Sequence, residues 1–470
     1  MSIFSTQKGG LSAVISKTDG KYILEMSYHS AQGGATMKKQ TRREFLKTTA
    51  IGAAAISASA ATPGNGGSQP KPPAAEDPMK RKMHTISTGE LERRWKAVRE
   101  LMKRDRIDYL IIRNDESFLG GPIKWFTDLP ATSNYPVTAI FPAEEEMTLI
   151  SHGAPAPGEP GPPPWAVRGV KKRLSSNYFP SALYTNSYDA ELAVGVLKEK
   201  KNAVIGLVGK AFIPISFFEY LSKDLPAAKF VDATDPIDHL MAIKSPEEIE
   251  LIKSVAALQD KAMDYVRKTI RPGKKEFEVF ADAQYACSSQ GSYRYVILVG
   301  SGRQGTAVSF LPPQYQNRTI QEGDQVSILI EVNGPSGLWT ELGRVITMGK
   351  PSQELQDAFG VALEAQKISL DLLKPGASPK DAWDANNAFL QGKGFSPERR
   401  AYAHGQGYHF VERPLIRNDE PMKIRAGMNL TVHPTAASRT VWAGLTDNYI
   451  ITESGPGPCI HKDPKQIIVI

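Results

Sequence analysis

Two stretches of the chain, roughly one hundred residues apart, follow the same plan, and this repetition limits the folds that the sequence can adopt. Residues 269–291 read TIRPGKKEFEVFADAQYACSSQG, and residues 372–394 read LLKPGASPKDAWDANNAFLQGKG. In each stretch a helix is expected to end at Pro-Gly, and a second helix begins soon after and ends near a glycine. Strand-like runs with Gly-rich turns follow both. The repetition predicts a pseudo-symmetric α+β domain, with a central antiparallel sheet, paired helices on one face and a site between the halves.

A helix signal marks where this domain begins. In IKSPEEIELIKSVAALQDKAMDYVRKTIRPG, Ser245 can cap the helix, Pro246 suits its first turn and Glu248 completes a capping box. Before it, helical patterns alternate with short apolar runs such as YLIIR and AVIGLV, which is typical of an α/β layer domain. A chain of 470 residues is also longer than one core usually organises. We therefore expect a smaller α/β domain over residues 85–240 and an α+β domain over residues 241–470.

The first part of the chain has the features of an export leader. Residues 37–60 begin MKKQTRREFLK, continue into a short apolar run of Ala, Ile and Gly, and end on Ala-Ser-Ala. The run is too short to span a membrane, and its small-residue end is typical of a cleavage site. TRREFLK resembles the twin-arginine export signal, which implies the twin-arginine export machinery as a partner and a periplasmic or other extracytoplasmic location. Residues 1–36 are expected to be neither leader nor domain, and residues 61–84 to be a Pro/Gly-rich linker.

Charge and cysteine usage give no support to nucleic-acid binding or to a cysteine metal site. The formal net charge is +7, but residues 1–60 hold eight Lys/Arg and three Asp/Glu and so carry +5 of it. The remainder is close to neutral, which gives nucleic-acid binding no support. Cys287 and Cys459 lie far apart without metal-type spacing, and free thiols are expected, although a disulfide stays open.

One expected hairpin carries two facing acidic residues. Residues 326–346, VSILIEVNGPSGLWTELGRVI, predict two strands joined by the turn NGPSG. With the turn centred on Ser336, Glu331 and Glu341 face each other with Cβ atoms about 5 Å apart. Like charges so placed need a metal ion, a shared proton or a cationic side chain. Arg344 is three positions from Glu341 and is therefore expected on the opposite face of the strand. The alternative is a shifted register that separates the two glutamates.

Three histidines and one Thr-Asp pair could complete a site. His404 and His409 are five residues apart in AYAHGQGYHFVERP, so they fall on opposite faces of a strand and at most one of them faces a given site. His433 lies in the strand-like run GMNLTVHPT, and Thr446 and Asp447 open the last strand pattern. Two glutamates and two histidines would suit Zn, Mn or Fe, although a single histidine is more often structural.

From about residue 85 to the C-terminus, the chain resembles the pita-bread enzymes aminopeptidase P, prolidase, methionine aminopeptidase and creatinase. The resemblance implies a pseudo-symmetric catalytic domain, a smaller N-terminal domain and a homodimer. The segments that carry it are IKSPEEIELIKSVAALQDKAM, IRPGKKEFEV, LVGSGRQGTAVSF, GDQVSILIEV, HGQG and GMNLTVHP.

The resemblance also implies a metal site, because the family's peptidases bind two metal ions through two Asp, one His and two Glu. The matching positions of this chain hold Glu331, Glu341, His404 and His433, and the two glutamates are ten positions apart where the family usually has eleven. At Thr446 the second family glutamate is missing, unless the neighbouring aspartate replaces it. The changes predict an altered site for one divalent metal, with Fe, Mn or Zn as candidates.

Two histidines that the family's peptidases use beside the substrate fall on Ser309 and Val411 in this chain. Glu412, which follows, matches the family and is the candidate general base, and His409 is a second catalytic candidate. The candidate substrate-binding residues are Ser309, Tyr408 and Arg413.

Three kinds of function are consistent with these residues. The first is an exported hydrolase that cleaves a C–N bond of a short-peptide or small carboxylate substrate, with metal or, as in creatinase, without it. The second is a lyase, because a metal beside a carboxylate base can assist proton removal. The third is a non-catalytic protein that binds a small ligand in the same cleft.

Overall fold

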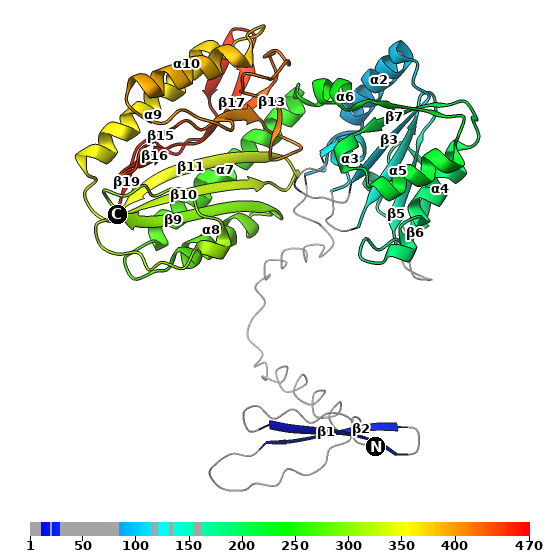
Figure 1. Cartoon of the computed structure of the whole chain (residues 1–470), viewed down its shortest axis with the longest axis horizontal. Helices are drawn as coiled ribbons and strands as arrows, with labels where there is room; N and C mark the ends of the chain where they lie inside the picture. Colours follow the sequence, from blue (N-terminus) through cyan, green and yellow to red (C-terminus); the bar gives the residue numbers. More distant parts are fainter. Residues whose placement is uncertain are drawn as a thin grey trace, which may run out of the picture. The chain divides into compact units, whose positions relative to one another are not determined.

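The computed structural model of the chain describes residues 11–18, 21–28, 84–114, 118, 121–130, 135–153 and 162–470 (Figure 1). The chain forms two compact units, residues 1–77 and 78–470. In the first unit, β1 (Leu11–Thr18) and β2 (Lys21–Tyr28) pair as an antiparallel ladder. The expected leader at 37–60 and nearly all of the linker at 61–84 lie outside the described residues. Within the described part of the chain, no helix has the length and apolar character needed to cross a membrane.

The second unit begins with a mixed six-stranded sheet in the order β6-β5-β4-β3-β7-β8. The apolar runs expected to be buried strands form two neighbouring, parallel strands of this sheet, β3 and β7. The strands are β3 (Tyr109–Asn114), β4 (Val137–Pro142), β5 (Met147–His152), β6 (Val170–Ser176), β7 (Val204–Val208) and β8 (Lys229–Asp232). The helices are α2 (Thr88–Asp105), α3 (Gly121–Thr127), α4 (Tyr188–Leu197), α5 (Ile215–Asp224) and α6 (Thr234–Met241).

Helix α7 (Pro246–Thr269) starts at the expected capping box and is held against the preceding α/β domain. The Ser245 hydroxyl accepts from the Glu248 N–H at 3.2 Å, and the Glu248 carboxylate accepts from the Ser245 N–H at 2.6 Å. The other Glu248 oxygen accepts at 3.0 Å from Arg94 of α2, a fully buried side chain that also donates to the Tyr408 hydroxyl at 2.6 Å. A cation with several partners out of water fixes the geometry of the groups it joins. Arg94 therefore holds the start of α7 and the loop at Tyr408 against α2.

The remaining chain forms two similar halves, as the repeated stretches predicted. In the first, α7 packs on β10 and β11 and α8 packs on β9; in the second, α9 and α10 pack together, and α9 contacts β15, β16 and β18 (Figure 1). The helices α8 (Glu276–Ser288) and α10 (Pro379–Gly392) lie inside the two similar stretches, and α9 spans Gln353–Leu372. The expected α+β class of this domain is confirmed.

Each half is built around one mainly antiparallel sheet, and the last strand of the chain joins the sheet of the first half. The first sheet, in the order β19-β11-β10-β9, consists of β9 (Tyr295–Arg303), β10 (Asp324–Asn333), β11 (Trp339–Thr347) and, parallel to β11, β19 (Ile468–Val469). The second, in the order β13-β12-β14-β17-β18, consists of β12 (Ala403–Gly405), β13 (Glu412–Leu415), β14 (Asn429–Val432), β17 (Asp447–Thr452) and β18 (Gly455–Cys459). A short ladder of β15 (Thr435–Ala437) and β16 (Trp442–Gly444) follows β14. A bridge between Gly343 and Thr446 links the two halves, so side chains of both can meet.

The two cysteines are free thiols, as expected from their spacing. Cys287 is buried in α8, and Cys459 is partly buried at the end of β18.

Candidate metal centre

The β10–β11 hairpin places two glutamates opposite each other. Glu331 pairs with Glu341 in the strand register, so the expected register is confirmed and the shifted one is excluded. The turn is closed by a hydrogen bond from the Gly334 N–H to the Leu338 carbonyl at 3.0 Å, and Gly337 adopts a positive φ of 80° that suits glycine. Both glutamates are only 5% exposed. Two carboxylates that share so dry a face need compensation from the groups around them.

Burial sets the protonation of this pair. Burial and the facing Glu341 hold the pKa of Glu331 well above its usual range. Burial also raises the pKa of Glu341 to about 7, against the opposing effects of the Arg400 cation and of a hydrogen bond from the Thr431 hydroxyl. Without a compensating cation, the pair therefore retains at least part of a proton near neutral pH.

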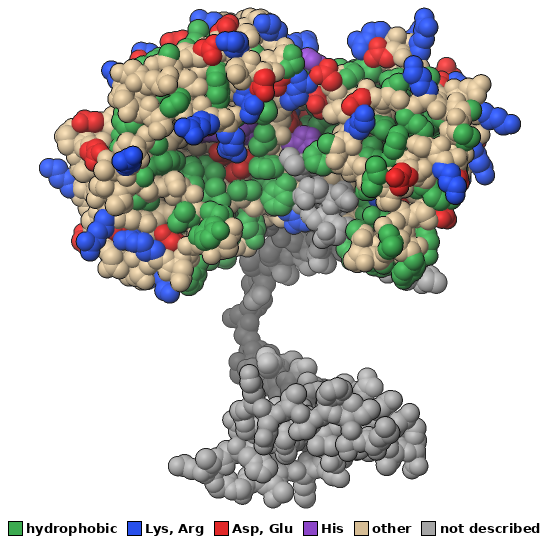
Figure 2. Space-filling view, viewed as in Figure 1, with side chains coloured by type: hydrophobic (Ala, Val, Ile, Leu, Met, Phe, Trp, Pro, Cys, Tyr) green, Lys and Arg blue, Asp and Glu red, His purple; other side chains and the backbone are tan. Residues whose placement is uncertain are grey.

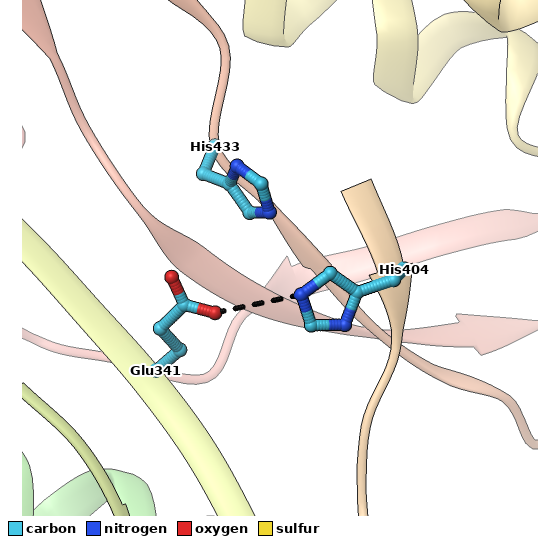
Figure 3. Close-up of side chains that lie close together, drawn as sticks. All are labelled: Glu341, His404 and His433. Atoms are coloured by element: carbon cyan, nitrogen blue, oxygen red, sulfur yellow. Dashed lines mark ion pairs between the residues drawn. The ribbon is translucent and has the colours of Figure 1, made fainter. Parts of the chain in front are cut away.

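Two histidines of the second half approach Glu341. His404 lies on β12 and His433 directly follows β14; their rings are 5.3 Å apart, and His404 Nε2 lies 3.7 Å from Glu341 Oε2 (Figure 3). One ligand atom from each of Glu341, His404 and His433 lies within 4.8 Å of the other two. Figure 2 shows histidine and acidic side chains gathered where the two lobes of residues 84–470 meet.

The two imidazoles are in the form that binds metal. Burial lowers the pKa of His404 to about 4, and burial together with the neighbouring His404 and Arg400 holds the pKa of His433 well below its usual range. His404 Nδ1 lies 2.9 Å from the Gly405 carbonyl, which can only accept, so Nδ1 carries the proton and Nε2 presents its lone pair toward Glu341. Neutral imidazole and carboxylate are ligands for Zn, Mn and Fe. The three side chains therefore fit one divalent ion with further coordination positions left open.

Glu331, also predicted as a ligand, lies beside this group and not within it. Its Oε1 accepts a hydrogen bond from Gln406 Nε2 at 2.8 Å. Gln406 Oε1 in turn accepts from Asn448 Nδ2 at 2.9 Å, and Asn448 Oδ1 accepts from the Glu341 N–H at 2.8 Å. Sequence reasoning did not find Gln406, which directly follows β12, or Asn448 of β17, although both are polar residues in otherwise buried segments, which was the available signal.

Asp447, considered as a replacement for the missing glutamate ligand, is bound to an arginine instead. Asp447 forms a fully buried ion pair with Arg344 at 2.8 Å, and Arg344 also binds Asp463 at 2.8 Å. Arg344 thus points away from the Glu341 face, as its strand parity predicted. Thr446, at the position of the missing glutamate, is buried, and its hydroxyl has no hydrogen-bond partner among the described residues. This position supplies a hydroxyl where the family resemblance leads one to expect a charged ligand.

Two predicted substrate-binding side chains have structural partners, and their role in substrate binding stays a prediction. Tyr408 is 3% exposed, and its hydroxyl belongs to the contact with Arg94. The Arg413 guanidinium forms ion pairs with Glu420 and Asp235. The sequence pattern could not reveal these partners, since Arg94 and Asp235 belong to the first domain.

The predicted general base is also engaged. Glu412 forms a buried ion pair with Lys244 at 2.5 Å, and its other oxygen accepts from the N–H groups of Tyr408 and His409. The carboxylate therefore holds the 407–412 turn in place, which argues against a free base. His409 Nδ1 accepts from the Gly121 N–H at 3.2 Å, and Ser309 lies exposed on the loop after β9.

Arg400 is a cation near the site that the sequence analysis did not single out. Its side chain is exposed, and the positive charge acts on both glutamates and both histidines of the site. Among the described residues its guanidinium forms no ion pair. It is therefore available to an anionic ligand.

Part of the chain is similar in sequence to known peptidases. Residues 250–453 match the model of metallopeptidase family M24. An Xaa-Pro dipeptidase from Pyrococcus horikoshii is 26% identical over 249 residues, which is 52% of this chain and 69% of the relative. The uncharacterized hydrolase/peptidase y4tL from Sinorhizobium fredii is 27% identical over 403 residues, 81% of this chain and 97% of the relative.

Solved structures show the fold over most of the chain. An X-Pro aminopeptidase from Thermotoga maritima has a TM-score of 0.67 at 19% identity and covers 80% of this chain and 99% of its own. The prolidase from Pyrococcus horikoshii has a TM-score of 0.62 at 21% identity, with 80% and 100% covered. The expected fold, a smaller α/β domain followed by a pita-bread domain, is thereby confirmed.

Replacing Glu341 by Gln should stabilise the metal-free protein in a pH-dependent way. The folded-state pKa of about 7 lies above the ordinary value near 4.5, so the fold gains from the bound proton at low pH and loses that gain as the pH rises toward 7. Glutamine resembles the protonated form at every pH. We expect a gain on the order of 3 kcal/mol above pH 7 that disappears by about pH 4.5.

Urea unfolding in the presence of a chelator, at several pH values, measures this difference. Glu453→Gln, at an exposed position of the same domain, is the control and should leave the free energy of unfolding nearly unchanged. A Glu341→Gln gain that is the same at pH 5 and pH 8 would show that burial does not raise this pKa.

Proposed function

We propose that this protein is a hydrolase of C–N bonds that works with one divalent metal ion, and the match of residues 250–453 to the model of metallopeptidase family M24 supports this. The observation that carries the proposal is the convergence of Glu341, His404 and His433, with ligand atoms within 4.8 Å of one another. Two histidines and one carboxylate with open positions are a ligand set that metallohydrolases use. When bound there, the ion would polarise a substrate carbonyl and lower the pKa of a water molecule.

The residues around the ion have complementary tasks. The neutral imidazoles and the buried hairpin provide a dry, fixed set of ligands, because burial keeps both histidines uncharged. Thr446 supplies no charge where a second ion would need a carboxylate ligand, which supports one ion and not two. The negative charge that can offset the divalent ion is then that of Glu341 and part of a charge on Glu331.

The substrate class that we propose is a short peptide or small amide with a free carboxylate. Arg400, exposed beside the site and without an ion pair among the described residues, is the group that would bind this carboxylate. The family match and the Xaa-Pro dipeptidase relative support a peptide-like substrate. Export through the twin-arginine pathway and a homodimeric state stay predictions from the sequence.

A second candidate function is ligand binding without catalysis. Ser309 and Val411 stand at the positions of two substrate-side histidines in the family resemblance, and Thr446 at that of a metal ligand. A protein that had lost catalysis could still bind a small ligand at the same residues. Metal content and hydrolysis, measured together, distinguish the two functions.

The metal assignment predicts a clear pattern of losses. Protein purified without chelator should contain close to one equivalent of Zn, Mn or Fe by elemental analysis. His404→Ala and His433→Ala should each lose this metal, because either change removes a ligand. His409→Ala is the matched control and should keep it, since that histidine binds the Gly121 N–H. A metal-free wild type, even after dialysis against each ion, would exclude the metalloenzyme and leave metal-free hydrolysis or ligand binding.

The substrate assignment predicts that Arg400→Ala raises KM selectively. For dipeptides such as Ala-Pro, KM should rise roughly 10- to 100-fold, the worth of a hydrogen bond to a charged group. The C-terminal amides of the same dipeptides should be unaffected, because they lack the carboxylate. Equal effects on acids and amides would show that Arg400 does not bind the carboxylate.

A further inference from the structure

We propose that Glu331 is the proton acceptor beside the metal and not one of its ligands, and that Gln406 is the positioning residue that holds it in this role. The inference rests on the proposed single-metal site and deepens it, because it assigns different tasks to two glutamates that face each other across one hairpin.

The contacts of the two glutamates differ. Glu341 Oε2 is 3.7 Å from His404 Nε2 and belongs to the group of three converging ligands. Glu331 is outside that group, and its Oε1 accepts from the Gln406 amide at 2.8 Å. Among the described residues, no hydrogen bond involves Glu331 Oε2. One Glu331 oxygen is thus held by an amide donor, while the other is available to a water molecule or substrate.

The orientation of the Gln406 amide is fixed on both sides. Its Nε2 has two acceptors, Glu331 Oε1 and the Phe410 carbonyl at 3.1 Å, and its Oε1 accepts from Asn448 Nδ2. A flipped amide would place its oxygen against two acceptors, so the flipped form is excluded by its hydrogen bonds. Gln406 is fully buried, which makes the loss of these partners costly.

Asn448 connects the same amide to the strand of the other glutamate. Its carbonyl oxygen accepts from the Glu341 N–H at 2.8 Å and lies 3.3 Å from His461 Nε2. Its amide also donates to Asn429 Oδ1 at 3.3 Å, and Asn429 donates to the Gln406 carbonyl at 2.9 Å. This closed set of neutral groups ties the position of Glu331 to that of Glu341. Through Gln406 it supplies one hydrogen bond to Glu331, a neutral partner in place of a second cation.

Geometry also decides between the two possible bases. Glu412 is held by Lys244 and by two backbone N–H groups, which leaves its carboxylate little capacity for a substrate. Glu331 has an available oxygen on the face that it shares with Glu341. With Cβ atoms about 5 Å apart across the ladder, both carboxylates reach the same small volume.

The hydrolytic step that follows is balanced. Glu331 accepts one proton from a water molecule as the water oxygen forms a bond to the substrate carbonyl carbon. The C–N bond then breaks, and Glu331 returns the proton to the departing nitrogen. The products are a carboxylic acid and an amine, and Glu331 ends as it began.

The test compares isosteric variants of the two glutamates, with cobalt(II) as the metal probe. Glu331→Gln should retain one equivalent of cobalt with an affinity within about threefold of wild type, while kcat for Ala-Pro falls by roughly 10²- to 10⁴-fold. Glu341→Gln should lose cobalt affinity, because it removes a ligand. Loss of cobalt from Glu331→Gln would overturn the inference by showing that Glu331 is a ligand.

Gln406→Ala tests the positioning role by a readout other than activity. Without the amide, Glu331 is free to enter the cobalt coordination sphere, so the visible cobalt spectrum should change and kcat should fall with little change in KM. The double variant Gln406→Ala/Glu331→Gln should regain the wild-type spectrum. Gln325→Ala is the matched control, because this buried glutamine of β10 bonds to the Trp442 carbonyl and should leave spectrum and kcat unchanged.

The outcomes separate this inference from the proposed function. A Gln406→Ala protein with the wild-type spectrum and kcat, in a wild type that binds one cobalt and hydrolyses Ala-Pro, overturns only the positioning role. A wild type that binds no cobalt, or that hydrolyses none of a panel of dipeptides, overturns the proposed function and the inference with it.

Discussion

Two carboxylates that face each other across a buried antiparallel ladder are the constraint on which the candidate site depends. Glu331 and Glu341 are paired in register and nearly excluded from water. The two glutamates have different polar neighbours, because imidazoles lie beside Glu341 and a neutral amide binds Glu331. In the proposed site, a single divalent cation would balance the charge beside Glu341 only. The asymmetry of the contacts is what argues for one metal and two different roles.

The pseudo-symmetric fold explains how such a site can form. The glutamates come from the hairpin of the first half, and His404 and His433 come from the second, joined where Thr446 bridges to Gly343. Neither half has the ligand set alone. Arg94, from the preceding domain, holds the start of α7 and the loop that contains Tyr408, so the site's position also depends on that domain.

Local patterns predicted the parts of the structure that local chemistry determines. The turn NGPSG and the period of two fixed the facing of Glu331 and Glu341, and the capping signals placed the start of α7 at Ser245. The roles of Tyr408 and Arg413 in substrate binding stay predictions, and the sequence could not reveal their partners, Arg94 and Asp235, because only the folded chain brings them together. Gln406 was missed for the same reason, since the carboxylate that it binds, Glu331, lies on another sheet. Residue type and spacing can therefore suggest a ligand, whereas the tertiary contacts decide whether it is free.

The most direct test of the account is a crystal structure of the cobalt-loaded protein, with the metal located by its anomalous scattering. The account predicts one peak, about 2.0–2.2 Å from Glu341, His404 and His433, with Glu331 still hydrogen-bonded to Gln406. Two peaks, or one peak that Glu331 and Glu341 share, would contradict it and show that the facing carboxylates bind metal together.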